Sequence, residues 1–273
     1  MERFECDLHC HTIRSDGYDS PEELIDNAAA LGLKVIAITD HDITPPLTVA
    51  LPGGGERDIR EYARSKGVEL VLGYEFSCDT YVDDVHILGY ALDWTSPLIE
   101  EEVERAKRAK SDAYRELCEI LTARGMPIDY EREILTYVTP AGEVKHRDPD
   151  EVQRKHIFEA MAAKGYAPTW QAAKLIVRDD PELNVRRRKI EAVQAIEVIH
   201  ALGGTAVLAH PYLIDERIEY PDGRVVTREE YIARLIEAGL EGIESCYPYG
   251  KTSYKGNLDD EEIKRRLEET YAG

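Results

Sequence analysis

Short segments that are apolar almost throughout constrain the fold of this chain more than any other feature. The clearest are VIAIT at 35–39 and AVLA at 206–209. Strands of this kind are covered by protein on both faces, as in a parallel sheet flanked by helices. Strand-like runs also occur at 4–11, 69–76, 85–92 and 242–246, with helix-period stretches between them. This alternation predicts an α/β fold built on a barrel or a wound sheet.

The alternation of strands and helices is interrupted in the middle of the chain. Before the interruption, Ser20 and Pro21 mark the start of a helix that runs to about Leu31 and is ended by Gly32, and a glycine-rich loop at 51–55 precedes a helix at 57–66. Between 97 and 189 the pattern predicts helices at 98–124, 149–164 and 169–177, and no convincing strand. A length of 273 residues suits one large barrel or a core with an insertion. We therefore expect a discontinuous barrel domain at 1–96 and 190–273, and an inserted helical subdomain at 97–189.

The charge balance limits the classes of partner. The chain has 34 basic and 54 acidic residues, a formal net charge of −20, so its mean field repels long duplex nucleic acid and acidic membranes. Small anionic substrates remain open, because bound divalent cations reverse the field inside a cleft. There is no run of 18 uncharged apolar residues, no signal-peptide pattern, and no C-x-x-C among the five cysteines. These features predict a cytoplasmic protein with reduced thiols and no membrane partner.

Two histidines lie on one side of the first expected strand. With a period of two, Asp7, His9 and His11 share one face of the strand, and Cys6 and Cys10 lie on the other. Side chains two positions apart on a strand are about 6.5–7 Å apart, so both imidazoles can reach one metal ion. The alternative is a half-buried strand with ordinary polar residues, which would suffice for a single histidine.

Other expected strands also end in residues that bind metal ions. Asp40 and His41 follow VIAIT, Glu75 follows LVLGY, His210 follows AVLA, and His86 lies near the start of VHILGYAL. In a barrel the strand ends converge on one rim, so residues distant in sequence meet there. Imidazole and carboxylate without thiolate suit Mn²⁺, Zn²⁺ or Fe²⁺, and a carboxylate can bridge two ions.

Five motifs at these strand ends carry a family resemblance. They are His9-Cys10-His11-Thr12 with Ser15-Asp16-Gly17, Thr39-Asp40-His41-Asp42, Gly73-Tyr74-Glu75, Val85-His86-Ile87-Leu88-Gly89 and Ala209-His210-Pro211. In order and spacing they resemble the motifs of the PHP (polymerase and histidinol phosphatase) family, over residues 4–94 and 190–273. Each motif alone is weak, but their joint occurrence is specific.

The resemblance implies a distorted (β/α)₇ TIM-like barrel that hydrolyses phosphate esters with two to three divalent metal ions. The implied ligands are His9 and His11 for one ion, Glu75 as a bridge to a second ion with His86 and His210, and Asp16 with His41 for a third.

Acidic residues near the ligands have implied roles of their own. Glu75 and Asp40 are the predicted catalytic carboxylates. Asp7, Asp40 and Asp42 are also expected to accept hydrogen bonds from the outer nitrogens of ligating histidines, which fixes the tautomer of each ring.

The sequence departs from the family pattern at its end. The family normally has a further strand with a G-S-D-x-H-like motif that supplies two more ligands, and the last barrel strand is missing here. Either the sequence belongs to a longer chain or the strand has been lost; we favour the former, because the preceding helix is intact and an unclosed barrel exposes an edge. If the strand is lost, the site of Glu75, His86 and His210 is the one expected to survive best.

Residues outside the motifs supply candidates for substrate binding. Arg154 and His156, on a helix expected to begin near Asp150, fit an R-x-H segment that binds phosphate in related enzymes; the alternative is a solvated helix face. The basic run at 186–189 is a candidate patch for a polyphosphate or an RNA end, although such runs are more often solvated. Tyr247 and Tyr249 follow an expected strand, where a substrate base could stack.

Three functions remain after these observations. The first is metal-dependent hydrolysis of phosphate monoesters by a metal-activated water, with a nucleotide or another small phosphorylated metabolite as substrate and an RNA or oligonucleotide end as a further candidate. The second is a metal hydrolase of C–N bonds, since the same ligands would activate water against an amide. The third is a non-catalytic, degenerate module that lacks its last ligands.

Overall fold

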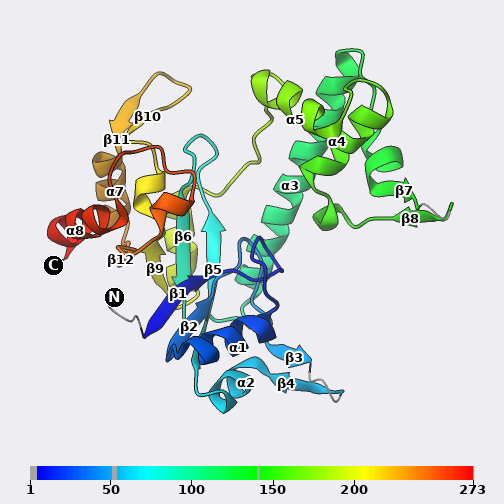
Figure 1. The fold of residues 1–273 in the computed structure, drawn as a ribbon. Helices are drawn as coiled ribbons and strands as arrows, with labels where there is room; N and C mark the ends of the chain where they lie inside the picture. Colours follow the sequence, from blue (N-terminus) through cyan, green and yellow to red (C-terminus); the bar gives the residue numbers. More distant parts are fainter. Residues whose placement is uncertain (1–4, 51–53, 140–141, 273) are drawn as a thin grey trace. The chain divides into compact units, whose positions relative to one another are not determined.

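The structure is a computed structural model that describes residues 5–50, 54–139 and 142–272. The chain divides into two compact units (Figure 1). Unit 1 comprises Met1–Val103 and Ile190–Gly273, and unit 2 comprises Glu104–Lys189. Each unit has a hydrophobic core of its own. Each is therefore described by itself.

The main sheet of unit 1 has six strands, in the order β1-β2-β5-β6-β9-β12. Their bounds are Cys6–Cys10 (β1), Val35–Ile38 (β2), Glu69–Ser77 (β5), His86–Tyr90 (β6), Thr205–Leu208 (β9) and Gly242–Ile243 (β12). The strands are parallel except for β6, which is antiparallel to β5 and β9. The α/β fold predicted from the sequence is confirmed, but β6 departs from the parallel sheet that was expected. The eight residues between β5 and β6 form a turn, since a parallel crossover needs a dozen residues or more.

The sheet is curled, as in a distorted TIM-like barrel. The strands at the two ends of its order, β1 and β12, come together at one edge. There, His9 on β1 lies with its Nδ1 atom 3.2 Å from Oε1 of Glu244, which follows β12 directly. This contact brings the first and last strand ends to the same place.

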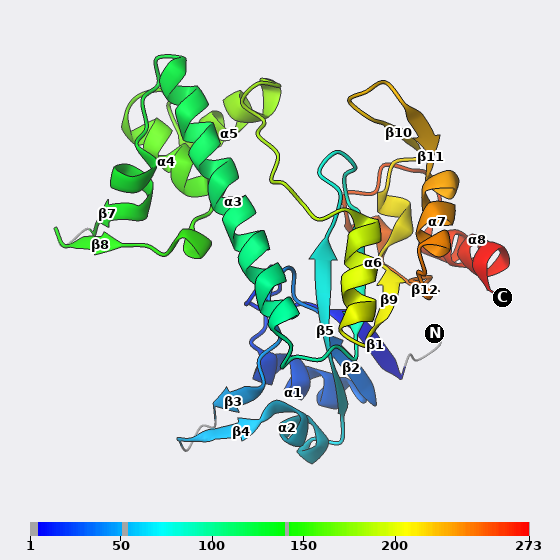
Figure 2. The same ribbon diagram turned by 180° about the vertical axis from the view of Figure 1, so that it is seen from behind.

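The helices of unit 1 begin at good capping residues. Helix α1 (Pro21–Leu31) starts with a capping box between Ser20 and Glu23 and ends at Gly32, whose φ of 78° is the left-handed conformation that glycine favours. The other helices are α2 (Ile59–Ser65), α6 (Ala192–Ala201), α7 (Arg228–Glu237) and α8 (Asp260–Tyr271). Helix α6 packs against β6 and β9 (Figure 2). The α1 prediction is accurate because its sequence signals are local.

Two short hairpins in unit 1 were not predicted. They are β3–β4 (Thr48–Ala50 and Glu56–Asp58) and β10–β11 (Arg217–Glu219 and Val225–Thr227). Their strands have three residues each and bury one side chain or none, so they carry no hydrophobic run. Part of the glycine-rich loop expected at 51–55, residues 51–53, lies outside the described residues.

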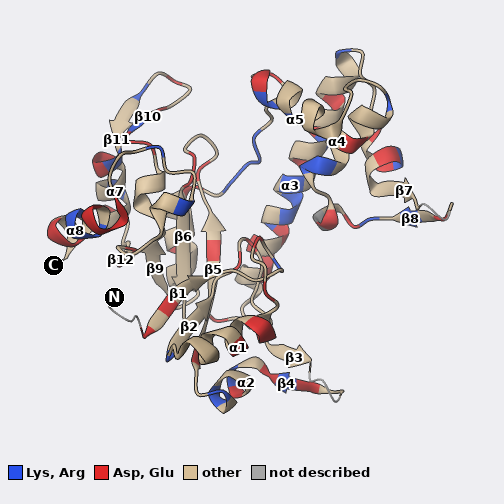
Figure 3. Ribbon diagram, viewed as in Figure 1, with Lys and Arg blue, Asp and Glu red and all other residues tan. Residues whose placement is uncertain are grey.

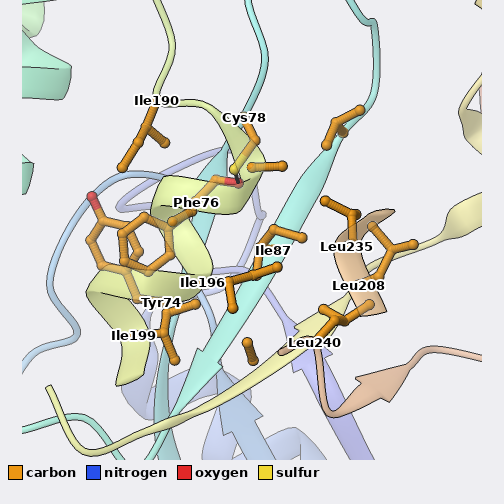
Figure 4. Close-up of a cluster of buried hydrophobic side chains, with 14 of the residues drawn as sticks. Tyr74, Phe76, Cys78, Ile87, Ile190, Ile196, Ile199, Leu208, Leu235 and Leu240 are labelled. Carbon is orange, nitrogen blue, oxygen red and sulfur yellow. Dashed lines mark hydrogen bonds between the residues drawn. The ribbon is translucent and has the colours of Figure 1, made fainter. Parts of the chain in front are cut away.

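Alternation along β5 separates the core from the opposite face of the sheet. Tyr74 and Phe76 are 1% exposed and pack in the core with Ile196 and Ile199 of α6 (Figure 4). Because successive side chains of a strand point to opposite faces, Glu75 faces away from this cluster. The apolar neighbours of Glu75 thus fix the strand, and the strand in turn directs a carboxylate to the concave side of the sheet.

Unit 2 is mainly helical and contains one small hairpin. After helix α3 (Pro97–Ala123) come a π-helical turn (Tyr130–Leu135), the antiparallel strands β7 (Thr136–Val138) and β8 (Val144–His146), helix α4 (Arg154–Ala163) and helix α5 (Trp170–Asp179). The expectation that this part has no strand is wrong. Val138 and Val144 are 65% and 71% exposed, so the hairpin leaves no burial pattern in the sequence. The helix expected at 149–164 begins only at Arg154, after a separate 3₁₀ turn at Pro149–Glu151.

Helix α3 (Pro97–Ala123) is the longest helix, with 27 residues. Its buried positions recur at helical spacing and include Ile99, Ala106, Ala113 and Leu117. Its remaining positions are largely charged. Among the residues that the structure describes, no helix is both long enough and apolar enough to cross a membrane.

Neighbouring positions on α7 provide a test of the unit 1 core. Leu235 is 1% exposed and belongs to the core, whereas Ile236 is 45% exposed. We expect Leu235→Ala to lower the free energy of unfolding by about 2–5 kcal/mol, because it leaves a cavity. Ile236→Ala, the matched control, should cost less than about 1 kcal/mol. Urea denaturation followed by circular dichroism measures both, and equal losses would contradict the packing described here.

Candidate metal centre

Five histidines surround the carboxylate of Glu75. Glu75 lies on β5, His9 on β1, and His11 directly after β1, while His41 follows β2 and His210 follows β9. The fifth histidine, His86, is the first residue of β6. Because β6 runs antiparallel to its neighbours, its beginning lies at the edge where the parallel strands end. The residues predicted from separate strand ends are therefore brought together.

The side-chain nitrogens lie close to both oxygens of Glu75. Oε2 is 3.2 Å from His9 Nε2, 3.1 Å from His11 Nε2 and 3.2 Å from His41 Nδ1. Oε1 is 3.0 Å from His86 Nδ1 and 3.3 Å from His210 Nε2. Glu75 is fully buried. One carboxylate thus touches two groups of imidazoles, one through each oxygen.

Several of these contacts lack hydrogen-bond geometry. Glu75 Oε2 and His41 Nδ1 are buried atoms without a hydrogen-bond partner, although they are 3.2 Å apart. His9 Nε2 and His11 Nε2 approach each other to 3.1 Å, nitrogen to nitrogen. Donor atoms that share a metal ion at about 2.1 Å are themselves separated by about 3.0–3.4 Å. The spacing and the unsatisfied atoms therefore fit ligands that converge on a cation.

Three groups of residues have donor atoms within 4.8 Å of one another. They are His9, Glu75 and His210; His41, Glu75 and His86; and His11, Asp16 and His41. In the third group, Asp16 Oδ1 lies 3.3 Å from His11 Nδ1 and its Oδ2 lies 3.8 Å from His41 Nε2. Asp16 is exposed, in contrast to Glu75. All seven predicted ligands are thus in one cluster, although the groups differ from the pairing implied by the motifs.

Burial and neighbouring charges shift the pKa values of Glu75, His41 and His9. Burial would raise the pKa of Glu75, but contacts with His11, His210, His41 and His86 hold it well below its usual range. Burial lowers the pKa of His41 to about 4 despite the opposing charge of Glu75, which leaves its ring neutral at pH 7. Burial also opposes protonation of His9, yet the contacts of its ring with the carboxylates of Glu244 and Glu75 raise its pKa to about 10. Ionised carboxylates and a neutral imidazole are the forms that bind a metal ion.

Glu244 belongs to the site and was missed in the sequence. Its two oxygens lie 3.2 and 3.3 Å from His9 Nδ1, the nitrogen opposite the one that faces Glu75. Its Oε2 also accepts a hydrogen bond from the backbone N–H of His210 at 2.7 Å. His210 has a φ of 29°, a strained conformation for this residue that this hydrogen bond helps to hold. An acid within the strand-like run at 242–246 was the signal available for it.

The three aspartates predicted to orient histidines make other contacts. Asp40 accepts hydrogen bonds from Thr12 N and Oγ1, each at 2.7 Å, and from Ser15 Oγ at 2.6 Å. Ser15 Oγ is also 3.3 Å from His11 Nδ1, so Asp40 reaches that histidine through the serine. Asp7 accepts from the backbone N–H of His9 rather than from its ring. Asp42 accepts from the backbone N–H of Ser77.

Two tyrosines near the cluster differ in exposure. The half-buried ring of Tyr247 is centred 5.0 Å from the ring of His210. Tyr249 is 1% exposed and packs in a small core with Ile263 and Leu267. The expectation that Tyr249 stacks on a substrate base is therefore wrong, because its ring faces are covered.

The predicted phosphate-binding residues lie at the start of α4 in unit 2. Arg154 Nη2 donates to the carbonyl of Val185 at 2.7 Å. His156 Nδ1 accepts from the backbone N–H of Gln153 at 3.0 Å. The role of both residues in substrate binding stays a prediction.

Comparison with known families identifies the chain. A family model described as PHP domain matches residues 7–172, which is more than half of the chain. The chain belongs to the PHP domain family. The resemblance found in the sequence is thereby confirmed, and the match contains six of the seven residues that converge in the cluster, all but His210.

Known PHP relatives act on phosphoester bonds. A 5'-3' exoribonuclease from Haemophilus influenzae is 32% identical over 206 residues, which cover 75% of this chain and 68% of the relative. A phosphoribosyl 1,2-cyclic phosphate 1,2-diphosphodiesterase from Eggerthella lenta is 28% identical over 253 residues, covering 89% and 82%. A 3',5'-nucleoside bisphosphate phosphatase from Chromobacterium violaceum is 27% identical over 241 residues, covering 87% and 75%.

A solved structure extends the similarity to the fold. A protein from Bifidobacterium adolescentis that carries the assignment of metal-dependent phosphoesterase superposes with a TM-score of 0.60. It is 26% identical in sequence, and the match covers 97% of this chain and 82% of that one. The assignment of this PHP chain to the metal-dependent phosphoesterases is confirmed, so the alternative of a non-catalytic module is not retained.

Glu244→Gln tests whether this carboxylate supports the metal centre. Loss of its charge should weaken Mn²⁺ binding about 10–100-fold, because His9 loses the acceptor that holds its outer nitrogen. Glu241→Gln is the matched control: Glu241 contacts His200 Nε2 at 3.2 Å and Ala206 N at 2.7 Å, outside the cluster. Calorimetric titration with Mn²⁺ measures both variants. Equal affinity in Glu244→Gln and the unaltered protein would contradict this role.

Proposed function

We propose that this PHP enzyme hydrolyses phosphate monoesters of a nucleotide or another small phosphorylated metabolite, with two to three divalent metal ions held by the cluster around Glu75. The observation that carries the proposal is the buried carboxylate of Glu75 with five imidazole nitrogens 3.0–3.3 Å from its oxygens. A ring of nitrogen and oxygen donors with no thiolate suits Mn²⁺, Zn²⁺ or Fe²⁺.

The residues proposed to hold the ions are those brought together by the strand ends. They are His9, His11, Asp16, His41, Glu75, His86 and His210. Ions bound there would lower the pKa of water and neutralise charge on the phosphate. Glu75, with one oxygen toward each group of imidazoles, is the residue suited to bridge two ions.

Other residues of this chain orient the proposed ligands. Glu244 fixes the ring of His9 and the backbone of His210 at the same time. Asp40 fixes the loop that carries Ser15 and so supports His11; although Asp40 was predicted as a catalytic carboxylate, both of its oxygens are occupied by this loop. We assign Asp40 a positioning role and Glu75 the catalytic one.

The choice of a monoester rests on the relatives and on Arg154 and His156. A guanidinium matches phosphate oxygens with two parallel hydrogen bonds, a geometry that suits a terminal phosphate. The relatives include a phosphatase of nucleoside bisphosphates and an exoribonuclease. A nucleotide, either free or at the end of an RNA or oligonucleotide, is therefore the proposed substrate class.

A substrate screen tests the proposal directly. The purified protein with added Mn²⁺ is assayed with p-nitrophenyl phosphate, nucleoside monophosphates, nucleoside 3′,5′-bisphosphates and acyl-amide substrates. Release of inorganic phosphate from a nucleotide supports the proposal. Amide turnover without phosphatase activity would overturn it in favour of a C–N hydrolase.

Glu75→Gln should abolish most of the activity. A neutral amide lacks the charge to bridge two cations, so we expect kcat/KM to fall about 10³-fold or more, about 4 kcal/mol in the barrier. Glu69→Gln is the matched control, since Glu69 is exposed at the other end of the same strand. Phosphate release measures both variants, and circular dichroism verifies that they are folded. Comparable activity in the two variants would exclude the role given to Glu75.

Removal of metal should lower stability as well as activity. A ligand present at 100 times its Kd stabilises the folded protein by about 2.7 kcal/mol, so EDTA should lower the Tm by about 5–10 °C. Added Mn²⁺ should restore the Tm. Differential scanning fluorimetry measures the shift, and Glu75→Gln serves as the control that should respond little. A Tm unaffected by EDTA in the unaltered, Mn²⁺-loaded protein would speak against a bound metal ion.

A further inference from the structure

The charge of the chain is divided very unequally between its two units. Glu104–Lys189 contains 18 of the 34 basic residues and 15 of the 54 acidic residues, so unit 2 has a net charge of +3. Unit 1 keeps 16 basic and 39 acidic residues, a net charge of −23. The mean charge of the chain therefore misrepresents unit 2, which is the part able to attract a polyanion.

Basic side chains from three segments of unit 2 are near enough to His156 to lower its pKa. Burial lowers the pKa of His156, and the positive charges of Arg147, Lys155 and Lys110 lower it further, while Glu159 opposes them. Lys110 lies on α3, Arg147 follows β8, and Lys155 lies on α4. Figure 3 shows basic positions on these same elements. The three cations from separate segments outnumber the one acid, Glu159, so the charge near His156 is positive.

The ring of His156 adds a hydrogen-bond donor to this excess of charge. Its Nδ1 accepts a hydrogen bond from Gln153 N at 3.0 Å. The neutral ring therefore carries its proton on Nε2, where it can donate. Since its lowered pKa keeps the ring neutral at pH 7, His156 donates a hydrogen bond without adding charge.

A second basic segment is tied to the same place. Arg154 Nη2 donates to the carbonyl of Val185, which directly precedes the four consecutive cations at 186–189. Arg186 and Arg188 are exposed. We call the set of these residues the basic surface; it consists of Lys110, Arg147, Arg154, Lys155, His156 and Arg186-Arg187-Arg188-Lys189.

Aromatic rings hold two of these cations in position. The guanidinium of Arg147 lies 4.3 Å from the ring centre of Tyr137, and Lys155 Nζ lies 5.2 Å from that of Trp170. Lys155 also pairs with Glu159, with 3.5 Å between Nζ and Oε1. Basic groups interleaved with aromatic rings are typical of surfaces that follow a single nucleic-acid strand.

We propose that the basic surface binds the phosphodiester backbone of a single-stranded nucleic acid. Eight cationic side chains exceed what one phosphate monoester can neutralise, whereas a strand presents one charge per nucleotide. A duplex fits less well, because its higher charge density is repelled by the −23 of unit 1. That the terminal phosphate of the bound strand is the group hydrolysed rests on the proposed function; the binding of the strand does not.

The test measures binding of a fluorescein-labelled single-stranded oligonucleotide to the full chain. Fluorescence anisotropy is followed in EDTA, which prevents cleavage, at salt concentrations from 50 to 300 mM. We expect the triple variant Lys110→Gln, Lys155→Gln, Arg188→Gln to bind at least about tenfold more weakly at 50 mM salt. The slope of log affinity against log salt should fall by about 2, since each contact with a single strand contributes about 0.7.

A second triple variant is the matched control. Arg132→Gln, Lys174→Gln, Arg178→Gln removes the same charge from unit 2 at residues outside the basic surface that are not among the largest charges acting on His156. This control should bind the oligonucleotide like the unaltered protein. Equal weakening in both triple variants, or no weakening in the first, would overturn the proposal.

Two further measurements distinguish this proposal from membrane binding and from the proposed function. Vesicles of phosphatidylcholine and phosphatidylserine at 3:1 should show no binding that depends on the basic surface; such binding, without oligonucleotide binding, would overturn the proposal in favour of a membrane. Turnover of p-nitrophenyl phosphate with Mn²⁺ tests the proposed function alone. An enzyme that turns over this ester but binds no oligonucleotide would refute only the present inference, and one that binds without turnover would refute only the proposed function.

Discussion

The site depends on the pairing of the ionised Glu75 carboxylate with the imidazoles around it. A fully buried charge is costly unless it is paired, and here the imidazoles of five histidines provide its immediate surroundings. The imidazoles come from four strands or their ends, so the carboxylate acquires all of its partners only when these strands have assembled. The hydrophobic packing of Tyr74 and Phe76 against α6 holds Glu75 on the opposite face of β5. Folding and ligand geometry are therefore coupled at one residue.

Much of this arrangement was predictable because its signals are local. Apolar runs locate the strands, and the rule that parallel strands end at one edge brings His9, His41, Glu75 and His210 together from the sequence alone. Helix α1 was predicted for the same reason, since Ser20, Pro21 and Gly32 act within one turn of its ends. Where the sequence carries a periodic or capping signal, the prediction is accurate.

The rest depends on contacts that no local signal records. Glu244 follows a strand of only two residues, and its partner His9 is 235 positions away. The bonds of Asp40 to Thr12 and Ser15 require the tight loop after β1, where Gly17 N donates to Thr12 O. A Cβ on Gly17 would lie 2.2 Å from His11 O, so only glycine fits that turn. The exposed hairpins, such as β7–β8, bury too little apolar surface to leave a pattern.

The antiparallel direction of β6 affects the order in which the residues of the cluster can come together. Glu75 and His86 are paired by a hairpin and are 11 residues apart, whereas His210 must close a loop of more than a hundred residues to reach them. Short loops close at a lower entropic cost and on a faster timescale than long ones. Sequence separation therefore ranks the steps of assembly: the β5–β6 hairpin brings Glu75 and His86 together at a small entropic cost, and the closure that adds His210 costs more.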